Sequence, residues 1–181
     1  PLNEPRADAA AVALGDGRTL LVAGTSGAGY LASTDLFAWD GLAGTWTAGP
    51  NGRARASVVA LPLGGGRALV AGGREPGDGA LGNVQLYLSD PIGGDTLMGA
   101  AGNALINGRS SPGVITLSPT SWLIVGGVAG NGNPRDTTET LAWDEALQRV
   151  DTIVGPPLPS PRWGGGSGQT ADGRLVFVGG S

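Results

Sequence analysis

The sequence contains no cysteine, no histidine and no lysine among its 181 residues. Without cysteine, disulfide bonds and thiol chemistry are excluded. Without histidine, so are histidine-based metal sites, Ser-His-Asp triads and histidine general bases. All 11 basic residues are arginines, and the 15 acidic residues bring the formal net charge to −4. The chain therefore has no basic stripe of the kind that nucleic-acid binding requires.

Long apolar runs are also absent. The longest, such as Ala9–Leu14 and Leu20–Ala23, are far too short to span a bilayer. The first residues lack a basic segment followed by an apolar one, so no secretory signal is visible, although a mature secreted protein would lack one too. The 35 glycines and 13 prolines stand beside short apolar segments, and 40% of the residues are hydrophobic. This composition indicates a folded chain of short strands joined by tight turns.

An internal repeat runs through the chain. Four arginines, spaced 49, 54 and 53 residues apart, each precede by twelve residues the start of a short apolar run: Arg6, Arg55, Arg109 and Arg162. Each run ends in two glycines or a related pair: Gly24-Thr25, Gly72-Gly73, Gly126-Gly127 and Gly179-Gly180. Four copies of one spacing predict a repeat architecture with a period near 50 residues.

Each full copy predicts four strands. The first strand follows the arginine, and a tight hairpin such as Asp16-Gly17 or Asp172-Gly173 leads into the second. In three copies a third strand has a polar residue followed two positions later by a bulky one, at Asp35, Gln85 and Glu139. A fourth short strand, marked by Trp46 in the first copy, closes the unit. No window shows a sustained helical period, so essentially no helix is expected.

The arginine, the Asp-Gly-Arg turn, the Val-Ala-Gly-Gly ending, the acidic-x-aromatic third strand and the tryptophan of the fourth strand resemble kelch repeats, in particular those of bacterial proteins. The resemblance implies an all-β, kelch-type β-propeller with antiparallel sheets. It covers three four-stranded blades plus strands A and B of a fourth, with bounds 5–50, 51–104, 105–158 and 159–181. We treat residues 1–181 as one partial propeller. Either the sequence is an incomplete portion of a longer protein, which we favour, or copies or a second chain complete the ring.

The four phased arginines are the first binding candidates. They could ring one mouth of a central channel and meet an acidic partner. The alternative, which we favour, is structural: each pairs with an acidic residue such as Asp35 or Glu139 and ties blade to blade. The resemblance is compatible with both, since arginines at this position help to line the binding face of some kelch domains.

The loops between the second and third strands differ most between copies, and variable loops on a rigid scaffold often carry function. Arg74 follows the diglycine directly and resembles a ligand-contacting position of some kelch domains. The other candidates with a side chain to offer are Tyr30, Glu75, Asp78, Arg135 and Asp136, together with Trp163, which has no counterpart in the other copies. Trp39 and Trp143 occupy equivalent positions and are expected to pack in the core.

These observations favour a non-enzymatic binding or scaffold module whose propeller-face loops bind a protein or glycan. No catalytic residue, metal site or cofactor is predicted, and no nucleic-acid or membrane partner. One alternative is part of a kelch-type carbohydrate-active enzyme whose site is completed by residues outside this chain, because carboxylate pairs need no histidine. Another is a structural component of a larger surface assembly. The resemblance favours an extracellular or cell-surface location.

Overall fold

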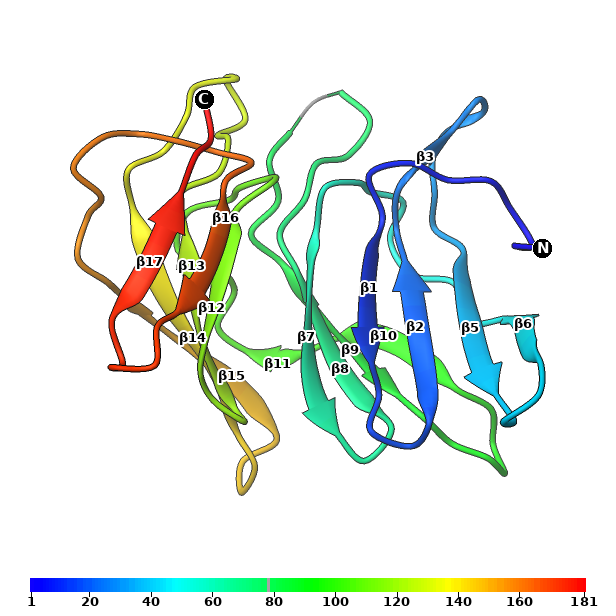
Figure 1. The fold of residues 1–181 in the computed structure, drawn as a ribbon. Helices are drawn as coiled ribbons and strands as arrows, with labels where there is room; N and C mark the ends of the chain where they lie inside the picture. Colours follow the sequence, from blue (N-terminus) through cyan, green and yellow to red (C-terminus); the bar gives the residue numbers. More distant parts are fainter. Residues whose placement is uncertain (78) are drawn as a thin grey trace.

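The computed structural model describes residues 1–77 and 79–181, and over those residues it contains strands and turns but no helix. The described chain thus offers no helix that could cross a membrane. The strands form three antiparallel sheets side by side, with a two-stranded pair at the end of the row (Figure 1). The expected all-β class, with antiparallel sheets and without helix, is confirmed.

The first sheet has the order β1 (Ala10–Ala13), β2 (Arg18–Val22), β5 (Thr34–Trp39) and β6 (Gly44–Ala48). A small hairpin, β3 (Thr25–Ser26) with β4 (Gly29–Tyr30), stands in the loop between β2 and β5. The turn between β1 and β2 uses Gly17 at φ 90° and a hydrogen bond of 3.0 Å from the Arg18 N–H to the Asp16 carboxylate. Asp-Gly sequences favour such turns because glycine adopts positive φ without steric cost.

The next two sheets repeat this plan. The second holds β7 (Val59–Gly64), β8 (Arg67–Ala71), β9 (Val84–Leu88) and β10 (Thr96–Gly99). The third holds β12 (Gly113–Ser118), β13 (Ser121–Val125), β14 (Thr138–Asp144) and β15 (Arg149–Val154). A short segment before it, β11 (Ala101–Gly102), pairs in parallel with β15. The C-terminal pair consists of β16 (Gly166–Gln169) and β17 (Leu175–Val178).

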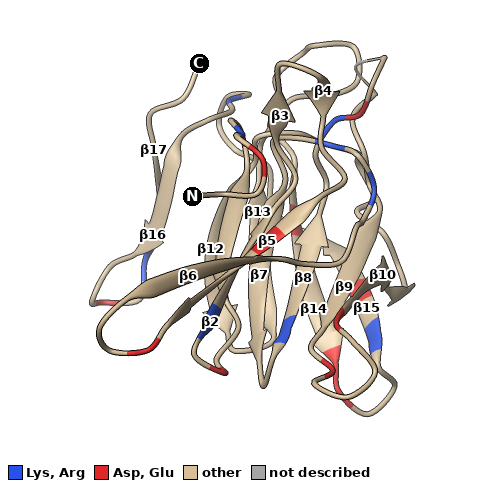
Figure 2. Cartoon of the chain, turned by 90° about the vertical axis from the view of Figure 1, so that its right-hand side faces the viewer, with Lys and Arg blue, Asp and Glu red and all other residues tan. Residues whose placement is uncertain are grey.

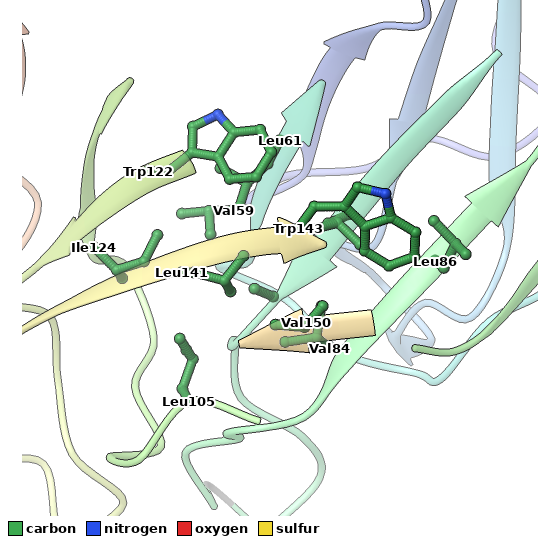
Figure 3. Close-up of a cluster of buried hydrophobic side chains, with 12 residues drawn as sticks. Val59, Leu61, Val84, Leu86, Leu105, Trp122, Ile124, Leu141, Trp143 and Val150 are labelled. Carbon is green, nitrogen blue, oxygen red and sulfur yellow. The ribbon is translucent and has the colours of Figure 1, made fainter. Parts of the chain in front are cut away.

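Two hydrophobic clusters hold the sheets together, one on either side of the second sheet. Side chains of a strand alternate between its two faces, so β9 contributes to both. Val84 and Leu86 join a cluster with the third sheet (Figure 3), whereas Tyr87 joins a cluster with the first. The second sheet is therefore covered on both faces, and its strands read as nearly continuous apolar runs such as Ala68–Ala71.

The two equivalent tryptophans have different surroundings. Trp143 is 4% exposed in the cluster between the second and third sheets, as expected of a core residue. Trp39 is 59% exposed, so the core prediction is wrong for this residue. The reason is that no sheet in the described part of the chain covers the face of the first sheet that carries Trp39. On that face Phe37 contacts Trp46, with ring centroids 5.0 Å apart.

The second strand of each unit ends in a left-handed turn. The residues at positive φ there are Ala23, Gly72, Gly126 and Gly179, with φ of 63°, 67°, 61° and 73°. The first copy therefore aligns as Ala23-Gly24, one residue earlier than the Gly24-Thr25 of the sequence alignment. The following glycine N–H donates to the carbonyl of the next unit's arginine, for example Gly24 to Arg55 at 2.9 Å and Gly73 to Arg109 at 2.8 Å. This turn thus connects each sheet to the next.

Candidate functional site

The phased arginines bind acceptors within their own sheet. Arg109 donates from Nη1 to the carbonyls of Gly126 at 2.7 Å and Thr137 at 2.8 Å, and from Nη2 to Glu139. Both charged side chains are fully buried. Glu139 also accepts backbone N–H groups of Ile106 at 2.6 Å and Asn107 at 2.9 Å. Every charge here is compensated, as burial of an ion pair requires.

Arg6 repeats this arrangement in the first sheet. Its Nη1 donates to the carbonyls of Ala23 at 2.9 Å and Ser33 at 2.8 Å, and its Nη2 lies 2.7 Å from Asp35. The Arg6 and Asp35 side chains are 1% and 0% exposed. The predicted arginine–acid pairing is confirmed for Arg6 and Arg109. The pairs join strands of one sheet rather than two sheets; it is the arginine carbonyl that reaches the neighbouring sheet.

Arg55 differs because the described residues of its sheet supply it with no carboxylate. Its Nη2 donates to Gln85 Oε1, which stands where the other sheets have an acid, and its Nη1 donates to Asn83 Oδ1 and the Gly72 carbonyl, each at 3.0 Å. Burial, and to a smaller extent the charge of Arg53, lowers the pKa of Arg55 to about 10. Arg55 is thus a buried cation whose acceptors in the described part of the chain are all neutral.

Replacing Gln85 with glutamate is expected to raise the free energy of unfolding by about 1 kcal/mol near neutral pH. A hydrogen bond to a charged group is worth about 1.5–3 kcal/mol, against about 0.5–1.5 kcal/mol for a neutral one. The sign of the pH dependence is also fixed. Because folding lowers the pKa of Arg55 in the wild type, its unfolded state binds the proton more tightly, and wild-type stability rises relative to the variant above pH about 10.

Urea unfolding of both proteins at about pH 8 and about pH 11 measures this difference. Gln85→Leu is the matched control, because it removes the acceptor without adding charge and should destabilise the protein. A glutamate variant less stable than the wild type at both pH values would contradict the interpretation.

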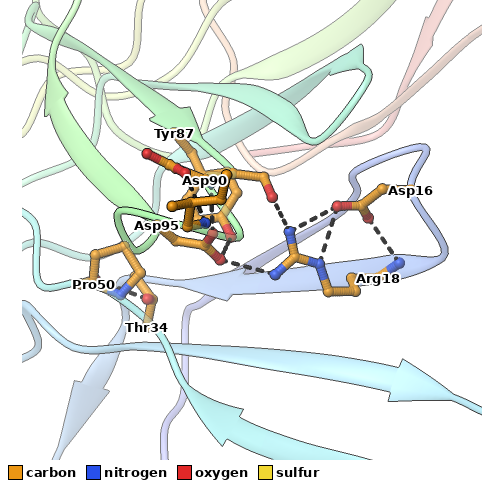
Figure 4. Close-up of polar contacts among 9 residues, drawn as sticks. Asp16, Arg18, Thr34, Pro50, Tyr87, Asp90 and Asp95 are labelled. Carbon is orange, nitrogen blue, oxygen red and sulfur yellow. Dashed lines mark hydrogen bonds and ion pairs between the residues drawn. The ribbon is translucent and has the colours of Figure 1, made fainter.

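A second group of arginines, at the hairpin between the first two strands, links adjacent sheets. Arg18 bonds Asp16 in its own turn and reaches Asp95 of the second sheet at 2.8 Å, where the Tyr87 hydroxyl donates to the same carboxylate (Figure 4). Arg67 pairs in the same way with Glu145 of the third sheet at 2.7 Å. These contacts lie at the end of the sheets opposite the variable loops.

The pKa shifts in this group describe a fixed ionic link. Burial works to raise the pKa of Asp95, but hydrogen bonds from Tyr87, the Asp90 N–H and Arg18 hold it below its usual value. Burial, together with the bond to Asp95, raises the pKa of Tyr87. Asp95 therefore stays ionised and Tyr87 neutral over the physiological range, so we assign the group a structural role.

A pocket lies at the other end of the sheets, between the variable loops and the segments that precede β1, β7, β12 and β16. This loop-end pocket has a volume of about 440 Å³ and is lined by Asp8, Ser57, Arg74, Ser110, Ser111, Val128, Gly132 and Trp163. A second pocket of about 420 Å³ shares Arg74, Ser110, Val128 and Gly132 with it. The loop-end pocket presents a guanidinium, a carboxylate, hydroxyls and an indole, which together can bind a polar ligand.

Three of its lining residues adopt a backbone conformation that is unusual outside glycine. Asp8, Ser57 and Ser111 stand two positions after their arginines and have φ of 54°, 57° and 50°. They are joined in sequence by backbone hydrogen bonds of 2.9 Å, from the Ser57 N–H to the Asp8 carbonyl and from the Ser111 N–H to the Ser57 carbonyl. Left-handed non-glycine residues cost of order 1 kcal/mol each and cluster at functional sites.

Arg74 is exposed and lines both pockets. Its backbone is fixed by two hydrogen bonds with Ala56, of 2.9 and 3.0 Å. Over residues 1–77 and 79–181, no hydrogen bond or ion pair involves its guanidinium. By contrast, the Nη1 and Nη2 groups of Arg6, Arg55 and Arg109 all donate hydrogen bonds. Arg74 therefore combines a backbone fixed by hydrogen bonds with a guanidinium that has no partner among the described residues, which is what a ligand-binding cation needs.

The structure brings Arg74 and Trp163 together in the loop-end pocket, with Trp163 40% exposed. It does not bring Tyr30, Glu75, Arg135 or Asp136 there. Glu75 pairs with Arg53 through Nε at 3.0 Å, and Arg135 donates from Nε to the Gly108 carbonyl at 3.1 Å. Asp136 is exposed and Tyr30 partly exposed on β4. Asp78 lies outside the described residues.

Sequence reasoning missed Asp8, Ser57 and Ser111 as pocket residues. Their shared position after the arginine was available from the repeat, and the fourth copy has Gly164 there at φ 70°. A glycine in one copy and small polar residues in the others is a weak signal for a left-handed backbone. Basic and acidic positions are otherwise interspersed along the strands and at both ends of the sheets (Figure 2). Among the described residues no three acidic side chains group to hold a metal ion.

Neither a protein-family model nor a curated protein matches the sequence. Solved structures with the same arrangement include YjhT, with a TM-score of 0.75 and 18% identity over 97% of this chain and 59% of that one. They also include a fungal alcohol oxidase of the AA5 family in complex with copper, with a TM-score of 0.69 and 17% identity over 96% of this chain and 37% of the oxidase. This chain thus spans less than two thirds of either. At these identities the likeness concerns the fold alone, which is all-β and β-propeller-like.

Proposed function

We propose that this chain is part of a kelch-type β-propeller that acts as a non-enzymatic binding or scaffold module, with the loop-end pocket contacting a protein or glycan partner. The repeat period near 50 residues supports the kelch assignment, as do the four strands per unit and the glycine turn that joins consecutive units. The three sheets and the C-terminal pair are then its blades.

The observation that supports the binding role is the environment of the Arg74 side chain. The protein keeps this guanidinium exposed without a partner among the described residues, beside the Ser57 and Ser111 hydroxyls and the indole of Trp163. Guanidinium groups bind carboxylates and other oxygen acceptors through two parallel hydrogen bonds, and indole faces stack on sugars and peptide groups. In this proposal the pocket binds a polar partner and catalyses no reaction.

Arg74→Ala is expected to weaken partner binding tenfold to a hundredfold. This corresponds to the roughly 1.5–3 kcal/mol of a hydrogen bond to a charged group, at about 1.4 kcal/mol per factor of ten. A glycan array tests glycan partners. A photocrosslinking residue in place of Ala129, which lines the second pocket, identifies protein partners in cells.

The matched controls lie at the opposite end of the third sheet. Arg149→Ala removes an arginine paired with Asp151, and a photocrosslinker in place of Leu147 occupies an exposed turn. Both should leave binding and crosslinking at the level of the array and cell background. Binding that survives both Arg74→Ala and Trp163→Ala would rule out the loop-end pocket as the contact.

One observation favours the enzymatic alternative: the Asp8 carboxylate lines the same pocket as Arg74. A carboxylate that acts as acid, base or nucleophile would make this part of a carbohydrate-active enzyme completed by residues outside the chain. Glycan turnover by the purified protein that is lost on Asp8→Asn would establish this alternative and reject the scaffold role.

A further inference from the structure

The loop-end pocket holds two side chains of opposite charge that do not pair with each other. Asp8 belongs to the segment before β1, and Arg74 to the loop after β8. Both are exposed, and in the described part of the chain neither side chain forms a hydrogen bond or an ion pair. Elsewhere an arginine and an acid that share a site do pair, as Arg53 does with Glu75. The pocket thus presents one cation and one anion to a ligand.

Three serine hydroxyls line the same pocket: Ser57, Ser110 and Ser111. Within the ranges that the structure describes, none of these hydroxyls has a hydrogen-bond partner. Ser110 is only 6% exposed, and it also lines the second pocket. Because most buried polar side chains in proteins are hydrogen-bonded, a serine buried to this extent indicates a pocket wall whose partner comes from outside the chain.

The backbone holds these groups in place before a ligand binds. The carbonyls of Asp8, Ser57 and Ser111 each accept an N–H group from the following unit, with Gly164 donating to Ser111 at 3.2 Å. Backbone hydrogen bonds therefore connect four successive units along the pocket. A site whose polar groups are already positioned loses less conformational entropy when it binds. The pocket is thus suited to a small ligand that makes its contacts without rearranging the chain.

The two charges restrict the class of ligand. An anion drawn to Arg74 would also approach Asp8, and a cation drawn to Asp8 would also approach Arg74. A neutral ligand would remove water from both charged groups without supplying a counter-charge, which is unfavourable. A zwitterion compensates both charges at once, because its field is complementary to that of the pocket. The volume of about 440 Å³ is in the range of small-molecule sites.

We propose that the loop-end pocket binds a free amino acid, whose ammonium group contacts Asp8 and whose carboxylate contacts Arg74. The guanidinium can hold the carboxylate through two parallel hydrogen bonds, and the serine hydroxyls bond the remaining oxygen and nitrogen lone pairs and protons. The apolar part of the ligand lies against Trp163, which is 40% exposed. This proposal rests on the binding role of the pocket argued above. Because both ligands use Arg74, the amino acid competes with the protein or glycan partner.

Isothermal titration calorimetry of the whole chain tests the ligand class. The probes are leucine, phenylalanine and a series with increasing charge separation: glycine, β-alanine, γ-aminobutyrate and ε-aminocaproate. Each is compared with analogues that lack only the ammonium group or only the carboxylate, which are caproate and hexylamine for ε-aminocaproate. We expect saturable binding of at least one amino acid at millimolar concentration or below. Its single-charge analogues should bind at least about tenfold more weakly, since each loses a hydrogen bond to a charged group.

Two variants assign the charges to their residues. Asp8→Asn keeps a residue type that tolerates the left-handed backbone, and it should abolish the preference for the amino acid over the analogue without an ammonium group. Arg74→Gln should abolish the preference over the analogue without a carboxylate. Arg149→Gln, at the opposite end of the third sheet, should change neither preference. A variant that has merely unfolded would lose binding of all compounds and show no thermal transition.

The failure of this inference can be told apart from the failure of the proposed function. Absence of amino-acid binding, or equally strong binding of the single-charge analogues, would overturn the inference. If partner binding still depended on Arg74, the proposed function would stand without it. Amino-acid binding that depends on Asp8 and Arg74 would support the inference, and no loss of partner binding on Arg74→Ala would then count against the macromolecular role alone.

Discussion

Replacing Arg109 with methionine is expected to lower the free energy of unfolding by about 3–5 kcal/mol, the cost of breaking a buried ion pair from one side. The change leaves the fully buried Glu139 without its cation, and removes the Arg109 hydrogen bonds to the Gly126 and Thr137 carbonyls. Urea denaturation followed by tryptophan fluorescence measures the loss. A buried carboxylate without its cation cannot recover its hydration, which is why the effect is large.

Arg162→Met is the matched control for this variant. It alters the same repeat position, but Arg162 is partly exposed and has no ionic partner in the described structure, so the loss should be about 1 kcal/mol or less. The double variant Arg109→Met with Glu139→Leu should recover part of the stability, because no unpaired charge stays buried. Equal losses for Arg109→Met and Arg162→Met would show that the Arg109 pair does not stabilise the third sheet.

Trp143→Ala is expected to destabilise the protein by about 3–5 kcal/mol, the range for truncating a buried aromatic residue. Trp143 is 4% exposed between the second and third sheets, and its indole N–H donates to Glu145 at 2.7 Å. Truncation therefore opens a cavity in the inter-sheet cluster and also releases the residue that pairs with Arg67.

Trp39→Ala provides the comparison at the equivalent position of the first sheet. Trp39 is 59% exposed, so its truncation should cost less than about 1 kcal/mol. Thermal unfolding of both variants by circular dichroism gives the two values side by side. Similar losses would mean that an unseen contact covers Trp39, and a small loss at Trp143 would contradict the packing of the second sheet against the third.

Much of the fold could be predicted because the same sequence pattern recurs in each unit of the chain. The alternation of polar and bulky residues placed Asp35 and Glu139 on the third strand of their units, and the phased arginines lie within reach of them. The first copy was misaligned by one residue because Ala23 takes the left-handed position that glycine holds in the other copies. A side chain with a Cβ gives no sequence signal for positive φ.

The candidate site was predicted less completely, for reasons that lie in tertiary structure. Arg74 was found because it follows the diglycine. Nothing in the sequence, however, distinguishes its guanidinium, which has no partner among residues 1–77 and 79–181, from the paired one of Arg53. Asp8, Ser57 and Ser111 come together only because neighbouring sheets place them side by side. The exposure of Trp39 likewise depends on what covers a sheet face, which a pattern within one strand does not encode.

The side chain and the backbone carbonyl of a phased arginine bond different sheets, and this limits how such a chain can be lengthened. The side chain of Arg55 serves its own sheet, while its carbonyl accepts the Gly24 N–H of the sheet before it. A duplication or deletion keeps both contacts only if its breakpoints fall at the same phase of the repeat. Insertion of whole repeat periods therefore preserves these hydrogen bonds. An insertion of any other length between an arginine and its glycine turn disrupts the hydrogen bonds of two sheets at once.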